Sequence, residues 1–367
     1  MTMSSKQPAT HPAIDNPLGT DGFEFVEFTG PNPTRLAEQF EQLGFVAMGR
    51  HRNKDVTHYR QGDINFILNA EAAGPASDFA EQHGQSANAM AFRVADAGQA
   101  LTEAVARGAT AVENRIGPME LNIPAIEGIG GLLIYLVDRY GASSIYDVDF
   151  EPIEGAQPRT DVGLTYIDHL THNLFRGNMD RWGAFYEDIF GFRETRYFDI
   201  EGKHTGLFSR AMTSPCGKIR IPLNESQDDK SQIEEFLHRY RGEGIQHIAL
   251  GADDIYATVD VLSRSGIAFQ DTPETYYEAL DARVPEHGED LDALRAHRIL
   301  VDGAPRDGQG LLLQIFTQDA IGPIFFEIIQ RKGNDGFGEG NFQALFESIE
   351  LDQIRRGVIS DDKGGSS

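Results

Sequence analysis

Apolar positions along the chain follow two periods, one typical of strands and one typical of amphipathic helices. The runs FEFVEF at 23–28 and LLIYLV at 132–137 predict strands. Apolar residues at helical spacing predict helices over 32–45 and 178–192, and each of these segments begins with an Asn and ends in Gly-Phe. The chain is therefore expected to mix helices and strands along its whole length.

The same pattern occurs twice within the chain. Three segments of the first part align with three of the second: 32–45 with 178–192, 88–109 with 244–267, and 132–141 with 324–333. A duplication of this kind predicts two similar halves, each built from strand, helix and strands repeated once. The stretch EPIEGAQPRT at 151–160 is rich in Pro, Gly and charge, and it is the expected linker between them.

Length and terminal composition complete the predicted organisation. A chain of 367 residues is long enough for two domains. The first residues are polar and Pro-rich and the last are SDDKGGSS, so both ends are expected to be flexible. The predicted parts are an arm over 1–20, an N-terminal domain over 21–150, a C-terminal domain over 161–359 and a tail over 360–367.

Charge and cysteine content exclude several classes of protein. Asp and Glu number 57 and Lys and Arg 32, so the formal charge is −25 and neither nucleic acid nor an anionic membrane is an expected partner. The single Cys216 excludes an intramolecular disulfide and any cysteine-rich zinc or iron–sulfur site. The N-terminal segment lacks the apolar core of a secretory signal, and no apolar run is long enough to cross a membrane. We therefore expect a soluble, cytoplasmic protein.

The duplication singles out three residues of the second half that could bind a metal ion. His169, His247 and Glu327 lie on three different predicted strands, separated by 78 and 80 residues. Their approximate counterparts in the first half offer no suitable ligands: Phe23, Met90 and Tyr135. Two His and one carboxylate form the facial triad of non-heme Fe(II) sites, which leaves coordination positions open for substrate and O₂. The same ligand types occur in catalytic zinc sites, so they do not by themselves select the metal.

Strand alternation sorts the polar and aromatic residues near these three. His172 is three residues from the first candidate histidine, so it faces the opposite side of a regular strand and is expected to be structural. Gln314 shares a face with Phe316, as Phe325 does with Glu327. A buried amide and aromatic rings beside a metal suit a flat aromatic substrate with a polar end, although core packing also explains them.

A Gly-rich segment follows the last predicted strand. The stretch GFGEGNF within 331–346 superficially resembles a phosphate-binding loop, but it lacks the Lys-Ser/Thr that such a loop requires. A hinge for an amphipathic C-terminal helix that covers the site fits this segment better.

Five segments together resemble the 4-hydroxyphenylpyruvate dioxygenase family: YIDHLTHN, SPCGKIRIPLNE, GIQHIAL, LLLQIFTQDAIGPIFFEIIQR and GFGEGNFQALFESIE. The resemblance is densest over 160–357 and more diffuse over 20–150. It implies an α+β fold of tandem βαβββ modules, two per half, that form two open β-barrel domains of the vicinal oxygen chelate type. Only the C-terminal barrel would hold iron.

The resemblance also assigns roles to individual residues. His169, His247 and Glu327 match the iron ligands of the family. Its polar substrate-pocket positions are matched by Ser209, Asn224, Gln232, Gln246 and Gln314, of which Gln314, Gln232 and Asn224 are expected to act in catalysis. Its aromatic wall and entrance helix are matched by Phe316, Phe325, Phe337, Asn341 and Phe342. Strand alternation turns Gln246 away from the metal, so a bulge or twist is needed to bring it to the pocket.

The implied activity is the Fe(II)- and O₂-dependent conversion of 4-hydroxyphenylpyruvate to homogentisate and CO₂, a step of tyrosine and phenylalanine catabolism. The 2-oxo acid would bind iron through its carboxylate and keto oxygens, and O₂ would take the third open position. Three alternatives stay open: 4-hydroxymandelate synthase, an extradiol catechol dioxygenase, and a ligand-binding protein without activity on the same fold. The pattern Pro222–Leu223–Asn224 favours the dioxygenase over the synthase. A homo-oligomer, either a dimer or a tetramer, is also expected.

Overall fold

In the computed structural model, the described residues are 15–113, 117, 120–201, 206–229, 231–345 and 355. Only 15–20 of the predicted arm fall within these ranges, and the predicted tail over 360–367 lies outside them. Among the described helices, none is both long and apolar enough to cross a membrane.

The first half of the chain forms a curled nine-stranded sheet in the order β6-β7-β8-β5-β1-β4-β3-β2-β9. Its strands are β1 (Thr20–Thr29), β2 (Val46–His51), β3 (Val56–Gln61), β4 (Ile64–Asn69), β5 (Ser86–Val94), β6 (Ala111–Val112), β7 (Ala125–Glu127), β8 (Leu133–Val137) and β9 (Phe150–Pro152). Its helices are α1 (Pro33–Gln42), α2 (Pro75–His83), α3 (Ala97–Ala106), the short 3₁₀ helix η1 (Ile129–Gly131) and α4 (Ile145–Asp149). The last strand, β9, pairs with β2 and ends inside the predicted linker.

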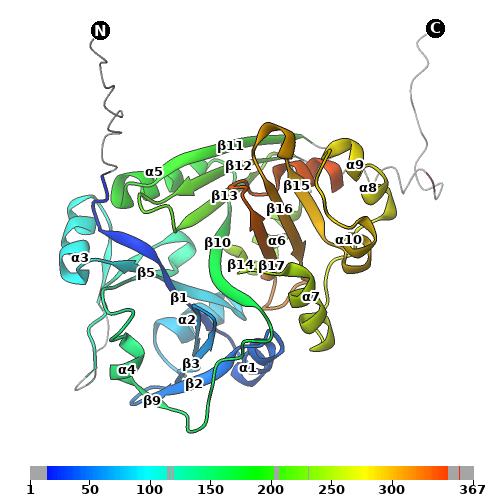
Figure 1. The fold of residues 1–367 in the computed structure, drawn as a ribbon. Helices are drawn as coiled ribbons and strands as arrows, with labels where there is room; N and C mark the ends of the chain where they lie inside the picture. Colours follow the sequence, from blue (N-terminus) through cyan, green and yellow to red (C-terminus); the bar gives the residue numbers. More distant parts are fainter. Residues whose placement is uncertain are drawn as a thin grey trace, which may run out of the picture.

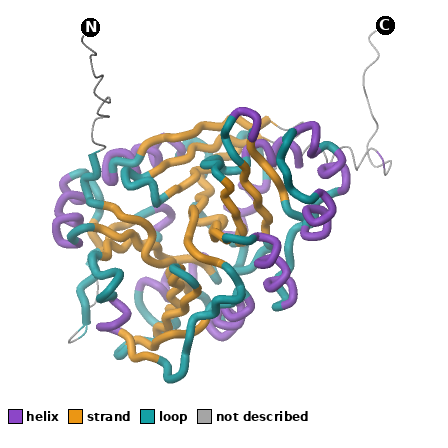
Figure 2. Tube along the Cα trace, viewed as in Figure 1, coloured by secondary structure: helices purple, strands orange, loops and turns teal. Residues whose placement is uncertain are grey.

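The second half forms an eight-stranded sheet in the order β11-β12-β13-β10-β14-β17-β16-β15. Its strands are β10 (Leu164–Leu174), β11 (Arg193–Glu201), β12 (Gly206–Thr213), β13 (Arg220–Ser226), β14 (Gly244–Ala252), β15 (Leu300–Gly303), β16 (Leu311–Phe316) and β17 (Phe325–Lys332). Its helices are α5 (Met179–Phe190), α6 (Gln232–Tyr240), α7 (Ile255–Arg264), α8 (Glu274–Glu278), α9 (Leu280–Arg283), α10 (Leu291–His297) and the 3₁₀ helix η2 (Pro305–Asp307). In Figure 2 the strands occupy the centre of the molecule and most helices its periphery.

Both sheets are built from two βαβββ modules, as predicted. In the first sheet β1 pairs antiparallel with β5, and each of these two strands pairs in parallel with the last strand of its own module, β4 or β8. The second sheet repeats this arrangement with β10 and β14 at its centre and β13 and β17 beside them. The predicted α+β fold of vicinal oxygen chelate type is therefore confirmed.

The predicted helices form because each can bury one apolar face against a sheet. Helix α1 buries Leu36 and Phe40, and the Asn32 side chain caps it by accepting a hydrogen bond from the Arg35 amide. Helix α5 also follows an Asn, but the Asn178 side chain makes no such cap. It donates a hydrogen bond to Glu243 instead, at 2.7 Å.

The two halves pack against each other through aromatic side chains. Phe66 of the first sheet lies 6.0 Å from Phe326 of the second, measured between ring centroids. The Gln61 side chain crosses the same junction, because it donates to the Leu43 carbonyl and accepts from the Leu164 amide. One apolar core therefore runs through both sheets, which lie side by side in Figure 1.

Strand register corrects two of the three predicted counterparts of the metal-binding candidates. His169 pairs with Ala249, which pairs with Glu327, whereas Phe25 pairs with Ala91, which pairs with Tyr135. His247 pairs with Phe325 as Ala89 pairs with Leu133. The counterparts are thus Phe25, Ala89 and Tyr135, so that Phe23 and Met90 were wrong by two residues and by one. β10 contains the same register shifts as β1, so the error at Phe23 arises in the connection to the next helix: Asn32 follows Phe25 by seven positions, whereas Asn178 follows His169 by nine. No such difference lies behind Met90, which was a misalignment by one residue.

Candidate metal centre

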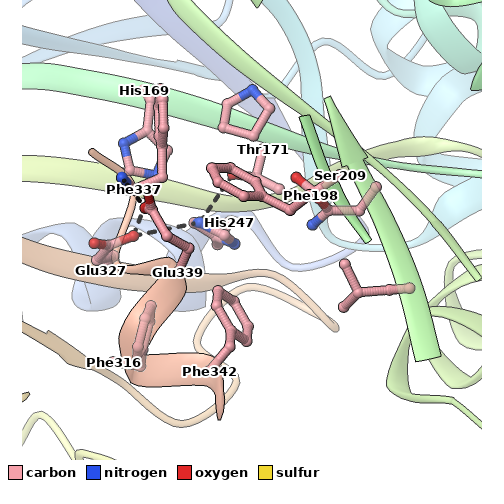
Figure 3. A pocket seen from close by; sticks show the side chains of 13 residues that line it. His169, Thr171, Phe198, Ser209, His247, Phe316, Glu327, Phe337, Glu339 and Phe342 are labelled. Atoms are coloured by element: carbon pink, nitrogen blue, oxygen red, sulfur yellow. Dashed lines mark hydrogen bonds and ion pairs between the residues drawn. The ribbon is translucent and has the colours of Figure 1, made fainter. Parts of the chain in front are cut away.

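Three side chains from three neighbouring strands converge on one point of the second sheet (Figure 3). Oε2 of Glu327 lies 3.2 Å from Nε2 of His169 and 3.4 Å from Nε2 of His247. The strands β10, β14 and β17 that carry these residues are adjacent in the sheet. Among the described residues, these three form the group of His, Cys, Asp and Glu side chains whose ligand atoms, all within 4.8 Å of one another, could hold a metal ion.

The three side chains are buried, which makes their charge costly unless a cation compensates it. Their exposed fractions are 2% for His169, 7% for His247 and 1% for Glu327. Burial alone raises the pKa of the Glu327 carboxyl, but the two imidazoles beside it hold that pKa below its ordinary value. Burial lowers the pKa of His247 and so favours its neutral form. An anionic carboxylate and a neutral imidazole are the forms that bind a divalent metal ion.

A second layer of hydrogen bonds fixes the orientation of His169. Its Nδ1 donates to Asp168, 2.8 Å away, so that Nε2 faces Glu327. Asp168 in turn accepts two hydrogen bonds from the guanidinium of Arg331, each of 2.7 Å. Burial raises the pKa of Asp168, but its bonds with Arg331 and His169 hold that pKa well below its ordinary value. Asp168 is therefore an anion that accepts from the imidazole.

Hydrogen bonds also fix the orientation of the His247 ring. Its Nδ1 donates to the side-chain oxygen of Gln246 at 2.8 Å, and its Nε2 shares a hydrogen bond of 2.9 Å with the Thr171 hydroxyl. The Phe325 ring stacks on the imidazole with 5.0 Å between centroids. Gln246 thus contacts a metal-ligand candidate and does not line the cavity, in agreement with strand alternation.

A small cavity opens beside the three candidate ligands. Its volume is about 40 Å³. Eight of the residues predicted for the site line it: His169, His247, Glu327, Ser209, Asn224, Phe316, Phe337 and Phe342. Five further lining residues were not among the predicted ones: Thr171, Phe198, Leu207, Pro222 and Glu339. Alternation along β10 could have identified Thr171, two residues after His169, whereas nothing in the sequence placed Phe198 and Leu207 in the cavity lining.

Four other predicted residues lie near the cavity without lining it, and a fifth lies elsewhere. Gln314 and Asn341 are buried behind the cavity wall, and Phe325 and Gln246 support His247. The structure does not bring Gln232 to the site, because this residue is exposed at the first turn of α6, next to the capping Ser231.

A polar network fixes the segment that closes the cavity. Gln314 donates to Glu327 at 3.3 Å and accepts from the Asn341 side chain at 3.0 Å. The oxygen of Asn341 accepts from the hydroxyl of Tyr276 at 2.6 Å and from Arg283 at 3.3 Å. Residues 339–345 form a helix, and the network joins it directly to the carboxylate of Glu327, a candidate metal ligand.

The loop before this helix packs directly on the candidate ligands. The Phe337 ring meets the His169 ring edge to face, with 5.4 Å between centroids. Gly338 follows with φ +76°, and a side chain there would meet the amide oxygen of Gln314. Glu339 lines the cavity, and its carboxylate forms an ion pair of 3.5 Å with the guanidinium of Arg196 on β11. The closing segment is therefore held from both sides of the cavity.

The sequence matches two family models. Residues 14–151 match the model described as hydroxyphenylpyruvate dioxygenase, N-terminal. Residues 166–292 match that of the glyoxalase, bleomycin resistance protein and dioxygenase superfamily. The class defined by the fold and the buried His–His–Glu group is thus that of the vicinal oxygen chelate proteins.

Individual relatives narrow this class. The chain is 64% identical over 348 residues to 4-hydroxyphenylpyruvate dioxygenase of Pseudomonas aeruginosa, covering 94% of this chain and 97% of that protein. It is 63% identical over 351 residues to a Vibrio vulnificus protein named hemolysin VllY, covering 94% and 98%. Among solved structures, a mutant 4-hydroxymandelate synthase from Streptomyces coelicolor matches with a TM-score of 0.79 at 27% identity, covering 91% and 99%. The chain belongs to the 4-hydroxyphenylpyruvate dioxygenase family.

Proposed function

We propose that this chain is a non-heme Fe(II) dioxygenase that converts 4-hydroxyphenylpyruvate and O₂ to homogentisate and CO₂. The observation that carries the proposal is the buried group of His169, His247 and Glu327, which lies against a cavity walled by phenylalanine rings. Two imidazoles and one carboxylate leave open coordination positions on Fe(II). Identity of 64% over nearly the whole chain to a relative named for this activity supports the same substrate.

The protein's own part in this reaction is to hold the metal, orient the substrate and exclude water. His169, His247 and Glu327 would hold the iron, which supplies O₂ activation and a binding point for the 2-oxo acid. Phe316, Phe337 and the other rings around the cavity hold the substrate ring in an apolar environment and keep water out.

Polar residues at the other wall suit the phenol end of the substrate. Ser209 of β12 and Asn224 of β13 are direct cross-strand neighbours, and both line the cavity. Their hydroxyl and amide groups can bind a phenol hydroxyl that points away from the metal, where Figure 3 places Ser209. Gln314 links the metal-ligand group to the closing segment, because it donates to Glu327 and accepts from Asn341. Gln246 positions His247, and the exposed Gln232 is not part of this proposal.

Substrate entry requires the closing segment to move. A cavity of about 40 Å³ has room for only a few water molecules, whereas sites for small organic ligands span roughly 300–1,000 Å³. Phe337, Phe342 and Glu339 line the cavity from the segment that begins after β17. We infer that this segment, together with the helix it starts, is the gate of the site, and that the structure is its closed form.

The closest alternative activity is that of 4-hydroxymandelate synthase, which shares the fold. Identity is 27% to the synthase structure but 64% to the Pseudomonas aeruginosa dioxygenase, so the dioxygenase is better supported. Both activities need the same metal centre, and the product distinguishes them: homogentisate carries the new hydroxyl on the ring and hydroxymandelate carries it on the side chain.

The cellular setting follows from the same proposal. We propose a cytoplasmic homo-oligomer, a dimer or tetramer, whose two domains span 21–150 and 161–359 and whose partners are small molecules. The formal charge of −25 fits such a role, because it disfavours nucleic acid and anionic membranes. The anionic keto acid is bound at a site whose charge is dominated by the metal ion.

Two histidines on one strand provide a matched test of the metal centre. His169 faces Glu327. His172 lies buried on the other side of β10, where its Nδ1 is 3.4 Å from the hydroxyl of Tyr186. We expect His169→Ala to lose bound iron and turnover, and His172→Ala to retain iron when folded. Iron content after desalting and homogentisate formation measure the two effects, and circular dichroism checks the fold. Full iron retention by His169→Ala would contradict the assignment.

A further inference from the structure

The first sheet contains a larger cavity at the position equivalent to the metal centre. Its volume is about 440 Å³, against about 40 Å³ beside the metal ligands. Phe25 and Tyr135 line this cavity, and strand register gives them the places of His169 and Glu327. A volume of this size lies in the range of sites for small organic ligands. The duplication has thus kept a hollow in the half that carries no metal ligands at these positions.

The residues of this N-terminal cavity suit an organic ligand better than a metal ion. Phe25, Ala89 and Tyr135 stand where the second half has two histidines and a glutamate, and they do not form a metal-binding group. The Phe25 and Tyr135 rings lie 5.6 Å apart and form an aromatic wall. Ile67, Leu133 and Phe150 continue the wall with apolar side chains. A ligand that packs on this wall therefore needs an apolar body.

Two hydrogen-bond acceptors at the floor of the cavity lack a donor. Glu27 is 7% exposed, and its Oε1 accepts from Asn69 at 3.0 Å and from Asn88 at 2.6 Å. Its Oε2 accepts no hydrogen bond from the described residues. Asn88 is 4% exposed, and its Oδ1 is buried without a partner among those residues. Because a buried unpaired acceptor is costly, a ligand that donates an N–H to Oδ1 of Asn88 gains the energy of satisfying it, and Oε2 of Glu27 offers a second acceptor in the same lining.

The charges around the cavity favour a cation as the donor. Glu27, Glu71 and Asp149 all line it. Burial raises the pKa of Glu27 against the hydrogen bonds from Asn88 and Asn69, so a cation beside this carboxyl would favour its charged form. The one lysine of the lining, Lys54, is already paired with Glu120 at 2.9 Å. Burial lowers the pKa of His51, so this histidine is neutral at neutral pH. An ammonium group would therefore meet a net negative environment, and the faces of Phe25 and Tyr135 would attract it further.

We propose that the N-terminal cavity binds a small organic ammonium ion, a protonated primary amine on an aromatic or other apolar body. Its N–H groups bond to Oε2 of Glu27 and Oδ1 of Asn88, and its body packs on Phe25 and Tyr135. The site is separate from the metal centre, so this binding does not depend on the proposed dioxygenase activity.

Calorimetric titration of the iron-loaded protein with 2-phenylethylamine tests this site, with 3-phenylpropionate as the anionic analogue of similar size. We expect the amine to bind one site per chain and the anion not to bind there. Glu27→Gln should weaken amine binding at least tenfold, because the amide group removes the negative charge. Leu133→Phe should also weaken it at least tenfold, because the larger side chain fills the cavity while Glu27 stays in place.

Glu243→Gln is the matched control. Glu243 is another buried glutamate that accepts side-chain hydrogen bonds, here from Asn178 and Trp182, and it is not part of the cavity lining. This variant should bind the amine as the unaltered protein does. No amine binding by the unaltered protein, or binding of 3-phenylpropionate that Leu133→Phe abolishes, would overturn the proposal. Amine binding that is unchanged in both Glu27→Gln and Leu133→Phe would overturn it as well. If Glu27→Gln does not fold, the result for Leu133→Phe alone tests the proposal.

Discussion

The carboxylate of Asp168 accepts a hydrogen bond of 2.8 Å from Nδ1 of its neighbour in sequence, His169. Consecutive strand residues normally point to opposite faces, but β10 has a register shift between Ile167 and His169. This irregularity lets an aspartate and the following histidine meet. It also fixes the histidine tautomer, because Nδ1 carries the proton and Nε2 is left to face the metal position.

Asp168→Asn should weaken iron binding while the fold is retained. The variant removes the negative charge that orients His169 and one of the two acceptors for Arg331, and loss of such a partner typically costs 10–100-fold in metal affinity. The dissociation constant for Fe(II) under anaerobic conditions measures the effect. Asp260→Asn is the control, because Asp260 pairs with His297 at 3.1 Å, away from the metal centre. Equal iron affinity in the two variants would contradict the role of Asp168.

Gly338→Ala should impair turnover without loss of iron. The residue has φ +76°, and an added side chain would meet the Gln314 amide that links the closing segment to Glu327. We expect kcat/KM to fall on the order of tenfold, because strain of about 1–3 kcal/mol opposes closure. Gly308→Ala separates backbone strain from contact, since Gly308 has φ +72° and nothing lies within 4 Å of the added carbon. If both variants reduce kcat/KM equally, the contact with Gln314 is not responsible.

The pH dependence of stability should contain a contribution from His58. Burial lowers the pKa of His58 to about 4, and its ring stacks on Tyr146 while Nε2 donates to Asn65. An unfolded histidine titrates near 6.5, so between about pH 4 and 6.5 the unfolded chain binds more protons at this position and stability rises with pH. The stabilisation is fully present above pH 6.5 and is lost as the pH falls toward 4.

His58→Gln should remove this contribution. We expect the free energy of unfolding to fall less between pH 7 and pH 5 in the variant than in the unaltered protein, by about 2 kcal/mol. Urea titrations at the two pH values measure the difference. The exposed His238, replaced in the same way, should leave the pH dependence unchanged. An identical pH dependence with and without His58 would show that the histidine does not stay neutral when folded.

Much of the fold was predictable because the apolar pattern occurs twice. Helices at 32–45 and 178–192 were expected, and α1 and α5 form there, since each apolar face has a sheet to cover. The duplication also singled out His169, His247 and Glu327 as candidate metal ligands, because a buried polar residue stands out where its counterpart in the other half is apolar or aromatic.

Register and side-chain direction were not predictable in the same way. The chain from His169 to the start of α5 is two residues longer than the chain from Phe25 to the start of α1, so matching the helices placed Phe23 where the strand register places Phe25. Met90 and Ala89 are both apolar, so the pattern did not reveal the one-residue error between them either. Gln232 was expected in the pocket by resemblance, but the start of α6 exposes it. The network of Gln314, Asn341 and Tyr276 joins segments far apart in the chain, and contacts of this kind follow only from the packed structure.

The most direct test of the central proposal is oxygen uptake by the Fe(II)-loaded protein with 4-hydroxyphenylpyruvate, with the product identified by mass and chromatography. We expect one CO₂ and one homogentisate for each O₂ consumed. Hydroxymandelate as the product would retain the iron centre but contradict the proposed ring hydroxylation. Iron-loaded protein that consumes no O₂ with this substrate would contradict the proposed function itself.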